Sequence, residues 1–262
     1  MKRLLLFDLD GTLLRTDKTI SRVTLEAIMQ CREKGFLIGI STARSEGNSE
    51  KALQEVKPDL IIASGGAIVR FQGQIVYEAG FTEEETRKII DTALFIGEQE
   101  REIATDTVDA HYWNYKVVPS EMDASWGETI YTDYQDFNGA ALKICVEIPE
   151  DCPQSQYAEE IAASVADCHW VRFSDGDWHK FGKAQATKEM ALAQSAESLG
   201  LALENIVAFG DDYADIGMLR MCGRGIAMGN AIEAVKEIAD EVIDSNDNDG
   251  IAKWIRLNIL QG

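Results

Sequence analysis

The stretch LLLFDLDGT, residues 4–12, decides the fold of this chain. An apolar run of strand length ends in Asp8 and Asp10, which are followed by Gly11 and Thr12. Side chains alternate along a strand, so the two carboxylates point the same way beyond its end. The glycine lets the backbone turn, and the N–H groups of the turn can face an anion. Paired carboxylates need a cation or a shared proton, which predicts a Mg²⁺ site with one carboxylate as nucleophile and the other as acid and base.

The structural alternative for residues 4–12 is a buried strand that ends in a solvated acidic turn, because short motifs also occur by chance. The rest of the chain is needed to decide. Its 262 residues, 45% of them hydrophobic and 27% charged, suffice for one or two globular domains. No apolar run approaches the roughly 20 residues of a membrane span. Asp8 interrupts the first apolar run, so we expect no signal peptide.

Charge and cysteine usage restrict the partners and the compartment. The formal net charge is −20 at pH 7, which argues against a nucleic-acid partner because its phosphates would be repelled. An anionic substrate would need a local positive site, made by a metal ion, a helix N-terminus or a few basic side chains. The cysteines are dispersed without a CxxC pair, which indicates reduced thiols in a cytoplasmic protein. They are Cys31, Cys145, Cys152, Cys168 and Cys222.

Residues 1–81 alternate between strand and helix patterns. The near-continuous apolar runs predict buried strands of a parallel sheet that helices cover on both faces. Ligands of such sheets bind beyond the carboxyl ends of the strands, and Asp8, Asp10 and Thr42 all follow predicted strand ends. The predicted elements are a helix over 21–34, a strand over 36–40, a helix over 48–56, a strand over 60–63 and a hairpin over 68–77.

The pattern changes at residue 82 and changes back at residue 184. We expect an α/β fold: a Rossmann-like parallel-sheet core domain of residues 1–81 and 184–262, with an α+β domain of residues 82–183 inserted into it. The insert should contain helices over 82–98 and 157–165 and strands over 111–117, 142–148, 170–173 and 178–181. The last part should contain helices over 188–199, 231–239 and 251–260 and strands over 205–209, 225–228 and 241–244.

Two later segments carry further candidate residues. Asp211 and Asp215 are four residues apart, so on a helical turn they share a face. They suit a metal site, and equally an ordinary acidic first turn of a helix. Lys188 opens a predicted helix, the end where a cation is disfavoured. An anion in front of it would explain the lysine; otherwise Lys188 is a solvated surface residue, with Lys180 and Lys183 as nearby competitors.

With these motifs the chain resembles the haloacid dehalogenase superfamily, specifically its Cof-type phosphatases with a type IIB cap. The ordered set of motifs is highly specific, and the insert lies where these enzymes carry their cap. The residues that carry the resemblance are Asp8-Leu9-Asp10-Gly11-Thr12, Thr42 with Arg44, Lys188 with Ala191-Leu192, Gly210-Asp211 with Asp215, and Met228-Gly229-Asn230-Ala231.

The resemblance implies that the protein hydrolyses the phosphate monoester of a small metabolite through an aspartyl-phosphate. Asp8 is the implied nucleophile. Asp10 is the implied acid for the leaving group and then the base for the attacking water. The side chains of Asp8 and Asp211 and the backbone carbonyl of Asp10 would hold Mg²⁺. Supporting roles fall to the phosphate-binding residues Gly11, Thr12, Thr42 and Lys188 and to the residues around the metal ligands, Asp212, Asp215 and Asn230.

Three positions depart from the family pattern: Ala43 and Gly65 replace the usual glycine and asparagine, and Ala214 replaces another asparagine. The loss of two side-chain amides can alter substrate contacts or the support of the metal. These departures leave open a non-catalytic sugar-phosphate sensor. Two further alternatives are a phosphosugar mutase of the same fold and a phospho-receiver domain, which also uses an acidic cluster, a Thr or Ser and a Lys.

Aromatic and histidine side chains are frequent in the insert, but alternating aromatic residues belong more often to a core than to a ligand site. We therefore leave out of the site His111, Tyr112, Trp113, Trp178 and His179.

Overall fold

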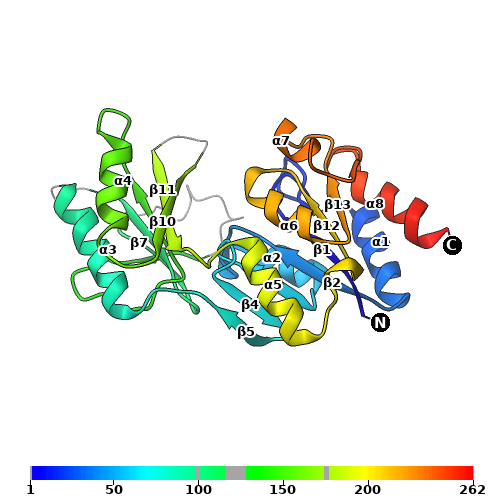
Figure 1. Cartoon of the computed structure of the whole chain (residues 1–262), viewed down its shortest axis with the longest axis horizontal. Coiled ribbons are helices and arrows are strands. Elements are labelled where there is room, and N and C mark those ends of the chain that lie inside the picture. The colour runs from blue at the N-terminus through cyan, green and yellow to red at the C-terminus, as the bar shows by residue number, and fades with distance from the viewer. Residues whose placement is uncertain (1, 98–100, 116–127, 174–176, 262) are drawn as a thin grey trace. The chain divides into compact units, whose positions relative to one another are not determined.

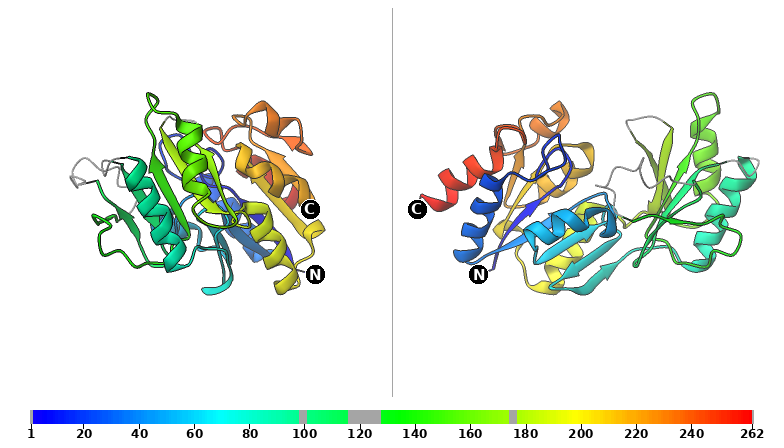
Figure 2. Two further views of the ribbon diagram at one scale, coloured as in Figure 1. Left: turned by 60° about the vertical axis from the view of Figure 1, so that its left-hand side comes forward. Right: turned by 180° about the vertical axis from the view of Figure 1, so that it is seen from behind.

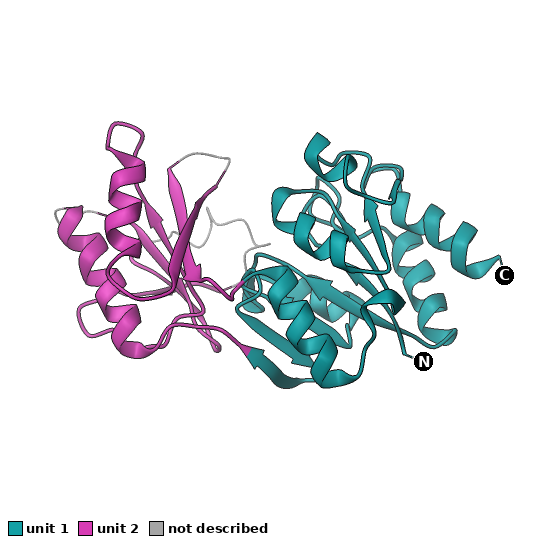
Figure 3. Cartoon of the chain, in the orientation of Figure 1, with its two compact units in different colours: residues 1–77, 187–262 teal, residues 78–186 magenta. Residues whose placement is uncertain are grey.

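A computed structural model of the chain describes residues 2–97, 101–115, 128–173 and 177–261. The chain forms two compact units: unit 1 comprises residues 1–77 and 187–262, and unit 2 comprises residues 78–186 (Figure 3). The predicted fold class, a parallel-sheet α/β core interrupted by an α+β insert, is confirmed. Two predicted ends, of the first insert helix at 98 and of the first insert strand at 117, lie outside the described residues.

Unit 1 contains an eight-stranded sheet in the order β14-β13-β12-β1-β2-β3-β4-β5. The strands from β14 to β3 are parallel, and β4 pairs with β3 in the antiparallel direction. The carboxyl ends of β1, β2 and β12 therefore meet at one edge of the sheet. The strands are β1 (Arg3–Phe7), β2 (Phe36–Ser41), β3 (Leu60–Ala63), β4 (Ile68–Phe71), β5 (Gln74–Glu78), β12 (Ile206–Gly210), β13 (Arg224–Ala227) and β14 (Glu241–Val242).

Strand β1 lies between β2 and β12, and this explains its composition. The side chains of Leu4, Leu5, Leu6 and Phe7 are all fully buried, and each such burial stabilises the fold by roughly 1.5–3 kcal/mol. Because both faces of a parallel sheet are covered, the strand reads as a continuous apolar run rather than as an alternating one. The buried strand thus delivers the polar residues that follow it to the middle of the sheet edge.

Helices cover both faces of the unit 1 sheet, with α1 and α8 on one face and α5 and α6 on the other (Figures 1 and 2). The helices are α1 (Arg22–Glu33), α2 (Glu50–Val56), α5 (Lys188–Leu199), α6 (Ile216–Met221), α7 (Glu233–Lys236) and α8 (Gly250–Ile255). Short 3₁₀ segments are η1 (Gly47–Ser49), η3 (Leu203–Asn205) and η4 (Tyr213–Asp215), and the π-helical segment η5 (Arg256–Leu260) follows α8.

Local sequence signals place several of these boundaries. Ser21 caps α1 and accepts a hydrogen bond from the Thr24 amide, as expected for an N-cap. The hairpin turns at Gln72 and Gly73, which both have positive φ angles, as the tight turns of hairpins require. Two predictions need correction: the helix predicted over 48–56 is divided between η1 and α2, and the helix predicted over 231–239 is confined to α7.

Unit 2 contains a six-stranded sheet in the order β10-β11-β9-β6-β7-β8, and α3 and α4 cover one of its faces (Figure 1). Its strands pair in the antiparallel direction except for β7 with β8. The elements are α3 (Glu83–Ile96), β6 (Ile103–Asp106), β7 (His111–Trp113), β8 (Ile130–Tyr131), β9 (Lys143–Glu147), α4 (Gln154–Ala162), β10 (Cys168–Arg172) and β11 (Trp178–Lys183). The short strands β6 and β8 and the six-residue helix α6 of unit 1 were not predicted.

One face of the unit 2 sheet forms a hydrophobic core with its helices. Ile103 pairs with Val146, and Ile144 with Phe181, and all four side chains are fully buried. They share a core cluster with residues of α3 and α4, among them Ile89, Ile90, Ala158 and Ile161. Because side chains alternate along a strand, the neighbours of these core residues point to the opposite face of the sheet.

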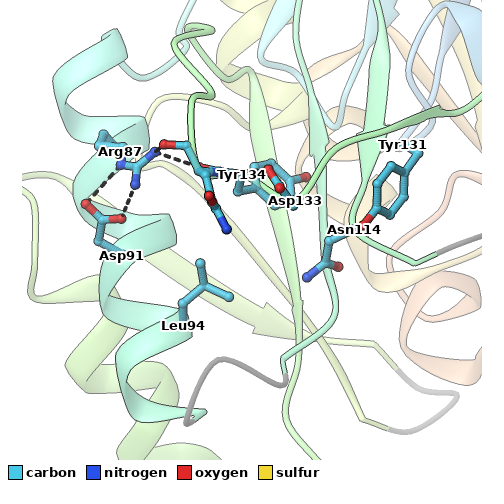
Figure 4. A pocket seen from close by; sticks show the side chains of 8 residues that line it. Arg87, Asp91, Leu94, Asn114, Tyr131, Asp133 and Tyr134 are labelled. Atoms are coloured by element: carbon cyan, nitrogen blue, oxygen red, sulfur yellow. Dashed lines mark hydrogen bonds and ion pairs between the residues drawn. The ribbon is translucent and has the colours of Figure 1, made fainter.

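A cavity of about 350 Å³ lies in unit 2 beside α3 (Figure 4). Arg87 forms an ion pair with Asp91 at 2.9 Å and donates hydrogen bonds to the carbonyl oxygens of Tyr134 and Gln135. The prominent charge in the cavity wall is thus used to hold the wall together. None of the site residues predicted from the sequence lines this cavity.

Among the described residues, no helix combines the length and the apolarity needed to cross a membrane.

The capping box of α3 provides a test of the fold of unit 2. The Thr82 hydroxyl accepts from the Glu85 amide, and the Glu85 carboxylate accepts from the Thr82 amide. We expect Thr82→Ala to lower the free energy of unfolding of unit 2 by about 1 kcal/mol, because the first turn loses a cap. Denaturant titration followed by tryptophan fluorescence measures this, since four of the five tryptophans lie between residues 78 and 186.

The matched control is Thr92→Ala in the middle of the same helix, where the threonine hydroxyl donates to the Lys88 carbonyl. This change should leave the stability unchanged or raise it slightly, because alanine is the better helix former. Equal losses for the two variants would contradict the assignment of Thr82 as the cap.

Candidate active site

The edge of the unit 1 sheet brings together polar residues that follow three neighbouring strands. Asp8 follows β1 and continues its ladder, with its amide donating to the Phe209 carbonyl at 3.0 Å. Thr42 follows β2, and its amide donates to the Ile62 carbonyl at 2.8 Å. Asp211 follows β12. The strand ladders thus determine where these three residues lie, as the parallel sheet predicts.

A buried lysine connects two of the carboxylates. The Nζ atom of Lys188 lies 2.6 Å from Oδ1 of Asp8 and 2.6 Å from Oδ1 of Asp215. The side chain of Lys188 is 4% exposed, and that of Asp215 is 1% exposed. Lys188 is therefore not a solvated surface residue, and the anions in front of its helix are carboxylates of the protein itself. The competing lysines Lys180 and Lys183 lie on β11 of unit 2.

The loop after β3 supports the helix end that carries Lys188. Gly66 has a φ of +104°, and a Cβ atom built there would lie 2.2 Å from the carbonyl oxygen of Thr187. Thr187 is the N-cap of α5 and accepts from the Met190 amide. Only a residue without a side chain permits this approach, so Gly66 lets the loop pack directly against the start of α5.

Asp215 organises the acidic turn that follows β12. Its Oδ2 accepts hydrogen bonds from the amides of Asp211 at 3.0 Å and Asp212 at 3.2 Å. The carboxylate of Asp212 in turn accepts from the Tyr213 amide and caps η4. Asp212 is thus a local capping residue, whereas Asp215 links this turn to Lys188.

The first loop is held against the later loops by short contacts. The Thr12 hydroxyl donates to Oδ1 of Asp211 at 2.7 Å. The side-chain amide of Asn230 donates to the Gly11 carbonyl at 2.7 Å. Gly11 has a φ of +77°, and a Cβ atom there would lie 2.2 Å from Oδ2 of Asp211. The glycine of the first motif is therefore required both by its conformation and by the Asp211 carboxylate beside it.

Three carboxylates of this edge form a group that fits a divalent cation. Asp8, Asp211 and Asp215 can each offer an oxygen atom, and these atoms all lie within 4.8 Å of one another. Burial raises the pKa of Asp211 to about 6 and the pKa of Asp8 well above its ordinary value, against the attraction of Lys188. Three carboxylates face one lysine, so negative charge is in excess. Carboxylate oxygens are the ligands that Mg²⁺ prefers, and the residues present therefore fit this ion.

The carboxylate of Asp10 does not join that group, because two cations hold it elsewhere. Arg44 donates to it from Nε at 2.6 Å and from Nη2 at 2.7 Å, and Lys18 donates at 2.9 Å. Burial opposes the effect, but these hydrogen bonds outweigh it and lower the pKa of Asp10. In the predicted metal set Asp10 can take part only through its backbone carbonyl. The sequence motif contained Arg44, whereas Lys18, in a polar loop, was missed.

Thr42 is buried next to the clamp that Arg44 and Lys18 form on the Asp10 carboxylate. Its Oγ1 accepts from the Arg44 amide at 3.1 Å, and its carbonyl accepts from the Gly65 amide at 3.0 Å. Gly65 itself has a φ of +71°, a left-handed conformation that asparagine tolerates better than most residues. The replacement of the family's asparagine by Gly65 is thus compatible with the backbone and removes only a side-chain amide.

Comparison with known sequences identifies similar proteins over almost the whole chain. A family profile described as haloacid dehalogenase-like hydrolase matches residues 5–255. A 5-amino-6-(5-phospho-D-ribitylamino)uracil phosphatase of Bacillus subtilis is 27% identical, and the match covers 97% of this chain and 96% of that protein. A pyridoxal phosphate phosphatase of Escherichia coli is also 27% identical, with 98% of this chain and 99% of that protein covered.

Solved structures show the same architecture. A haloacid dehalogenase-like hydrolase from Bacteroides thetaiotaomicron has a TM-score of 0.87 at 22% identity, covering 98% of this chain and 99% of that chain. A sugar phosphatase of HAD subclass IIB has a TM-score of 0.78 at 25% identity, covering 98% of each chain. Both units of the present chain fall within these matches.

The raised pKa of Asp211 predicts how Mg²⁺ binding depends on pH. The carboxyl group must lose its proton to bind the ion, and it keeps that proton up to about pH 6. We expect the affinity for Mg²⁺ to increase by at least about tenfold per pH unit below pH 6, because Asp8, whose pKa is also raised, must release its proton as well. Titration calorimetry in buffers of different ionisation enthalpy measures both the affinity and the protons released.

In this experiment Asp211→Asn should abolish the pH-dependent binding. Asp247→Asn is the control, because among the described residues that carboxylate accepts hydrogen bonds from Thr16 alone, a residue on the surface. An affinity that is independent of pH between 5 and 7 would show that the acidic group is already ionised and would contradict the prediction.

Proposed function

The chain belongs to the haloacid dehalogenase-like hydrolases and is a phosphoric monoester hydrolase of that type; we propose that it uses Mg²⁺ and releases phosphate from a small phosphorylated metabolite through an aspartyl-phosphate intermediate. The observation that carries the proposal is the group of Asp8, Asp211 and Asp215, in which the buried Lys188 contacts Asp8 and Asp215. It supports the proposal because the Asp8 carboxylate lies beside a fixed ammonium group and near two further carboxylates.

The first proposed step is the attack of the Asp8 carboxylate on phosphorus. A P–O bond to Asp8 forms while the P–O bond to the leaving group breaks, and the leaving alkoxide takes a proton from Asp10. Mg²⁺, held by Asp8, Asp211 and the backbone carbonyl of Asp10, would supply positive charge that reduces the repulsion between the anionic nucleophile and the phosphate. Lys188 supplies further positive charge at the Asp8 oxygen to which it donates.

In the second proposed step Asp10 removes a proton from water, and the water oxygen displaces the Asp8 carboxylate from phosphorus. The base role suits the arrangement described here, because Arg44 and Lys18 keep the Asp10 carboxylate ionised. The acid role of the first step requires that Asp10 exchange these two partners for a proton. We therefore propose two arrangements of the Asp10 side chain: one bound to Arg44 and Lys18 that acts as the base, and one released from them that acts as the acid.

We propose that Gly11, Thr12, Thr42 and Lys188 bind the phosphoryl oxygens. Thr42 supports this most directly: its hydroxyl oxygen accepts from the Arg44 amide, and its hydroxyl hydrogen has no acceptor among the described residues. Lys188 is a shared donor between two carboxylates. We also assign Asp212, Asp215 and Asn230 to the support of the metal ligands. Asp215 and Asn230 bond to the loops on which these ligands lie, and Asp212 caps the turn that follows Asp211.

The proposed substrate class is a sugar phosphate or a similar small metabolite. It is supported by similar proteins that act on a phosphoribitylamino-uracil, on pyridoxal phosphate and on sugars. We propose residues 82–183 as the cap domain that selects the substrate, and residues 1–81 with 184–262 as the core domain. All five cysteines are free thiols, which supports a cytoplasmic location.

The proposed nucleophile can be tested directly. We expect Asp8→Asn to reduce phosphate release by at least about a thousandfold, because the amide cannot form the phosphoenzyme, and we expect EDTA to abolish the activity. The assay measures inorganic phosphate from a panel of hexose phosphates, pyridoxal phosphate, nucleotides and p-nitrophenyl phosphate. Isomerised sugar phosphate in place of inorganic phosphate would indicate a mutase.

The control for Asp8→Asn is Glu26→Gln, which makes the same chemical change in an exposed ion pair on α1. It should leave the activity unchanged. Activity that survives both EDTA and the Asp8 substitution would exclude the proposed mechanism.

The role of Asp10 predicts a dependence on the leaving group. An alkoxide needs a proton to leave, whereas p-nitrophenolate does not, so Asp10→Asn should slow the first step by about 10²–10⁴-fold for an alkyl phosphate and far less for p-nitrophenyl phosphate. Single-turnover kinetics with both substrates measures this step. With the aryl substrate in excess over the enzyme, the slow removal of the phosphoryl group from Asp8 should appear as a burst of p-nitrophenolate. Equal slowing of the first step for both substrates would contradict the acid role.

A further inference from the structure

The face of the unit 2 sheet opposite α3 and α4 carries a cluster of charged residues. Asp106 on β6 lies directly across from His111 on β7 and from Lys143 on β9. Its strand neighbour Thr105 pairs with the core residue Ile144 and points to the helices. The alternation along the strands therefore places the Asp106, His111 and Lys143 side chains together on the other face.

The three side chains form a closed ionic arrangement. Oδ1 of Asp106 lies 2.6 Å from Nδ1 of His111, and Oδ2 lies 2.9 Å from Nζ of Lys143. Asp106 is 1% exposed, whereas the side chains of His111 and Lys143 are 15% and 12% exposed. Burial opposes the effect, but Lys143 and His111 lower the pKa of Asp106 to about 2. The Asp106 carboxylate is thus ionised and buried, whereas the His111 and Lys143 side chains that contact it are partly exposed.

The Asp106 carboxylate contacts two nitrogen groups, those of His111 and Lys143. Lys143 alone neutralises Asp106, so a protonated His111 gives the cluster an excess charge of +1. Lys180 on β11 and Glu147 on β9 also lie on this face, because Lys180 pairs with Cys145, which is two residues from both Lys143 and Glu147. The buried Asp106 fixes the positions of His111 and Lys143, so the cluster presents two nitrogen groups on a face that also carries the Glu147 carboxylate.

His111 is oriented as a hydrogen-bond donor. A carboxylate can only accept, so Nδ1 of His111 carries the hydrogen that bonds to Asp106. Nε2 is the remaining polar atom of the ring and has no partner among the described residues. An anion that binds Nε2 would favour the doubly protonated ring, and its second oxygen would be available to the Lys143 ammonium.

We propose that His111 and Lys143, positioned by Asp106, form a binding site on unit 2 for a small oxyanion, either a carboxylate or a phosphate group. The site consists of unit 2 residues alone and goes beyond the hydrolysis proposed for unit 1. Trp113 lies two residues from His111 on the same face and packs edge-on against Trp178, with 5.9 Å between the ring centroids. This aromatic pair provides an apolar surface for the organic part of such a ligand.

The small number of histidines makes the site directly observable. The chain contains three, so the long-range ¹H–¹⁵N spectrum of the full-length protein shows three imidazole rings, and His111→Gln identifies the signal of His111. The probes are malonate, succinate and inorganic phosphate, each titrated at constant ionic strength against sodium chloride. We expect a saturable shift of the His111 Nε2 signal with at least one probe. A response to the dicarboxylates or to phosphate identifies which oxyanion the site prefers.

Matched variants separate binding from general charge effects. Lys143→Met should weaken the binding of the probe by at least tenfold. Lys88→Met removes the same charge from an exposed ion pair on α3 and should bind like the original protein. Far-ultraviolet circular dichroism and thermal unfolding verify that each variant is folded. If Lys143→Met does not fold, Lys143→Arg replaces it and is compared with His111→Gln. Lys143→Arg keeps the charge and should retain binding of the probe.

The proposal is overturned if no probe shifts the His111 signal beyond the effect of sodium chloride, or if Lys143→Met and Lys88→Met bind equally well. Its test is also separate from the test of the proposed function. Asp8→Asn should leave the His111 response to dicarboxylates intact even though it abolishes phosphate release. If Asp8→Asn loses phosphate release but its His111 signal still shifts with the probe, both proposals stand. If the original protein releases phosphate but its His111 signal does not shift, only the oxyanion site is refuted.

Discussion

The burial of the Lys188 ammonium between Asp8 and Asp215 is the interaction on which the site of unit 1 depends. The three residues come from the end of β1, the first turn of α5 and the turn after β12, and their charged atoms lie 2.6 Å apart. Removing charges from water is costly, and the loss of one partner of a buried pair costs about 3–5 kcal/mol. The chain therefore forms this contact only if all three segments reach their positions together, which couples the site to the fold of the sheet.

Several features of the surrounding loops follow from this contact. Gly66 lets the loop after β3 approach the N-cap of α5, and Gly11 leaves room for the Asp211 carboxylate. Asp215 uses one oxygen for Lys188 and the other for two backbone amides, so it cannot turn freely toward a ligand. Asp8 and Asp211 do not carry this double load, so their carboxylates are the more accessible ones for the proposed metal ion.

The sequence contained the parts of this arrangement that follow from local patterns. The continuous apolar run of β1 predicts a central buried strand, and the parallel sheet then requires that Asp8, Thr42 and Asp211 share an edge. The clamp of Lys18 on Asp10 was not predictable, because a lysine in a polar loop carries no signal of its tertiary partner. The faces of the unit 2 strands were also ambiguous: His111 and Tyr112 are adjacent in sequence, but only Tyr112 packs against the core cluster. Strands of two to four residues such as β6 and β8 are too short for a periodic signal.

The charge balance of each buried cluster indicates the ligand that completes it. In unit 1, three carboxylates lie near one lysine, and burial, together with repulsion between the carboxylates, raises the pKa of Asp8 and of Asp211. In unit 2, one carboxylate serves a histidine and a lysine, and its pKa is lowered. A cluster built only for stability gains nothing from such an imbalance, since a buried pair is already hard to stabilise when its charges are equal. The excess of carboxylates therefore favours a cation at the first cluster, whereas the histidine and lysine nitrogens of the second favour an anion.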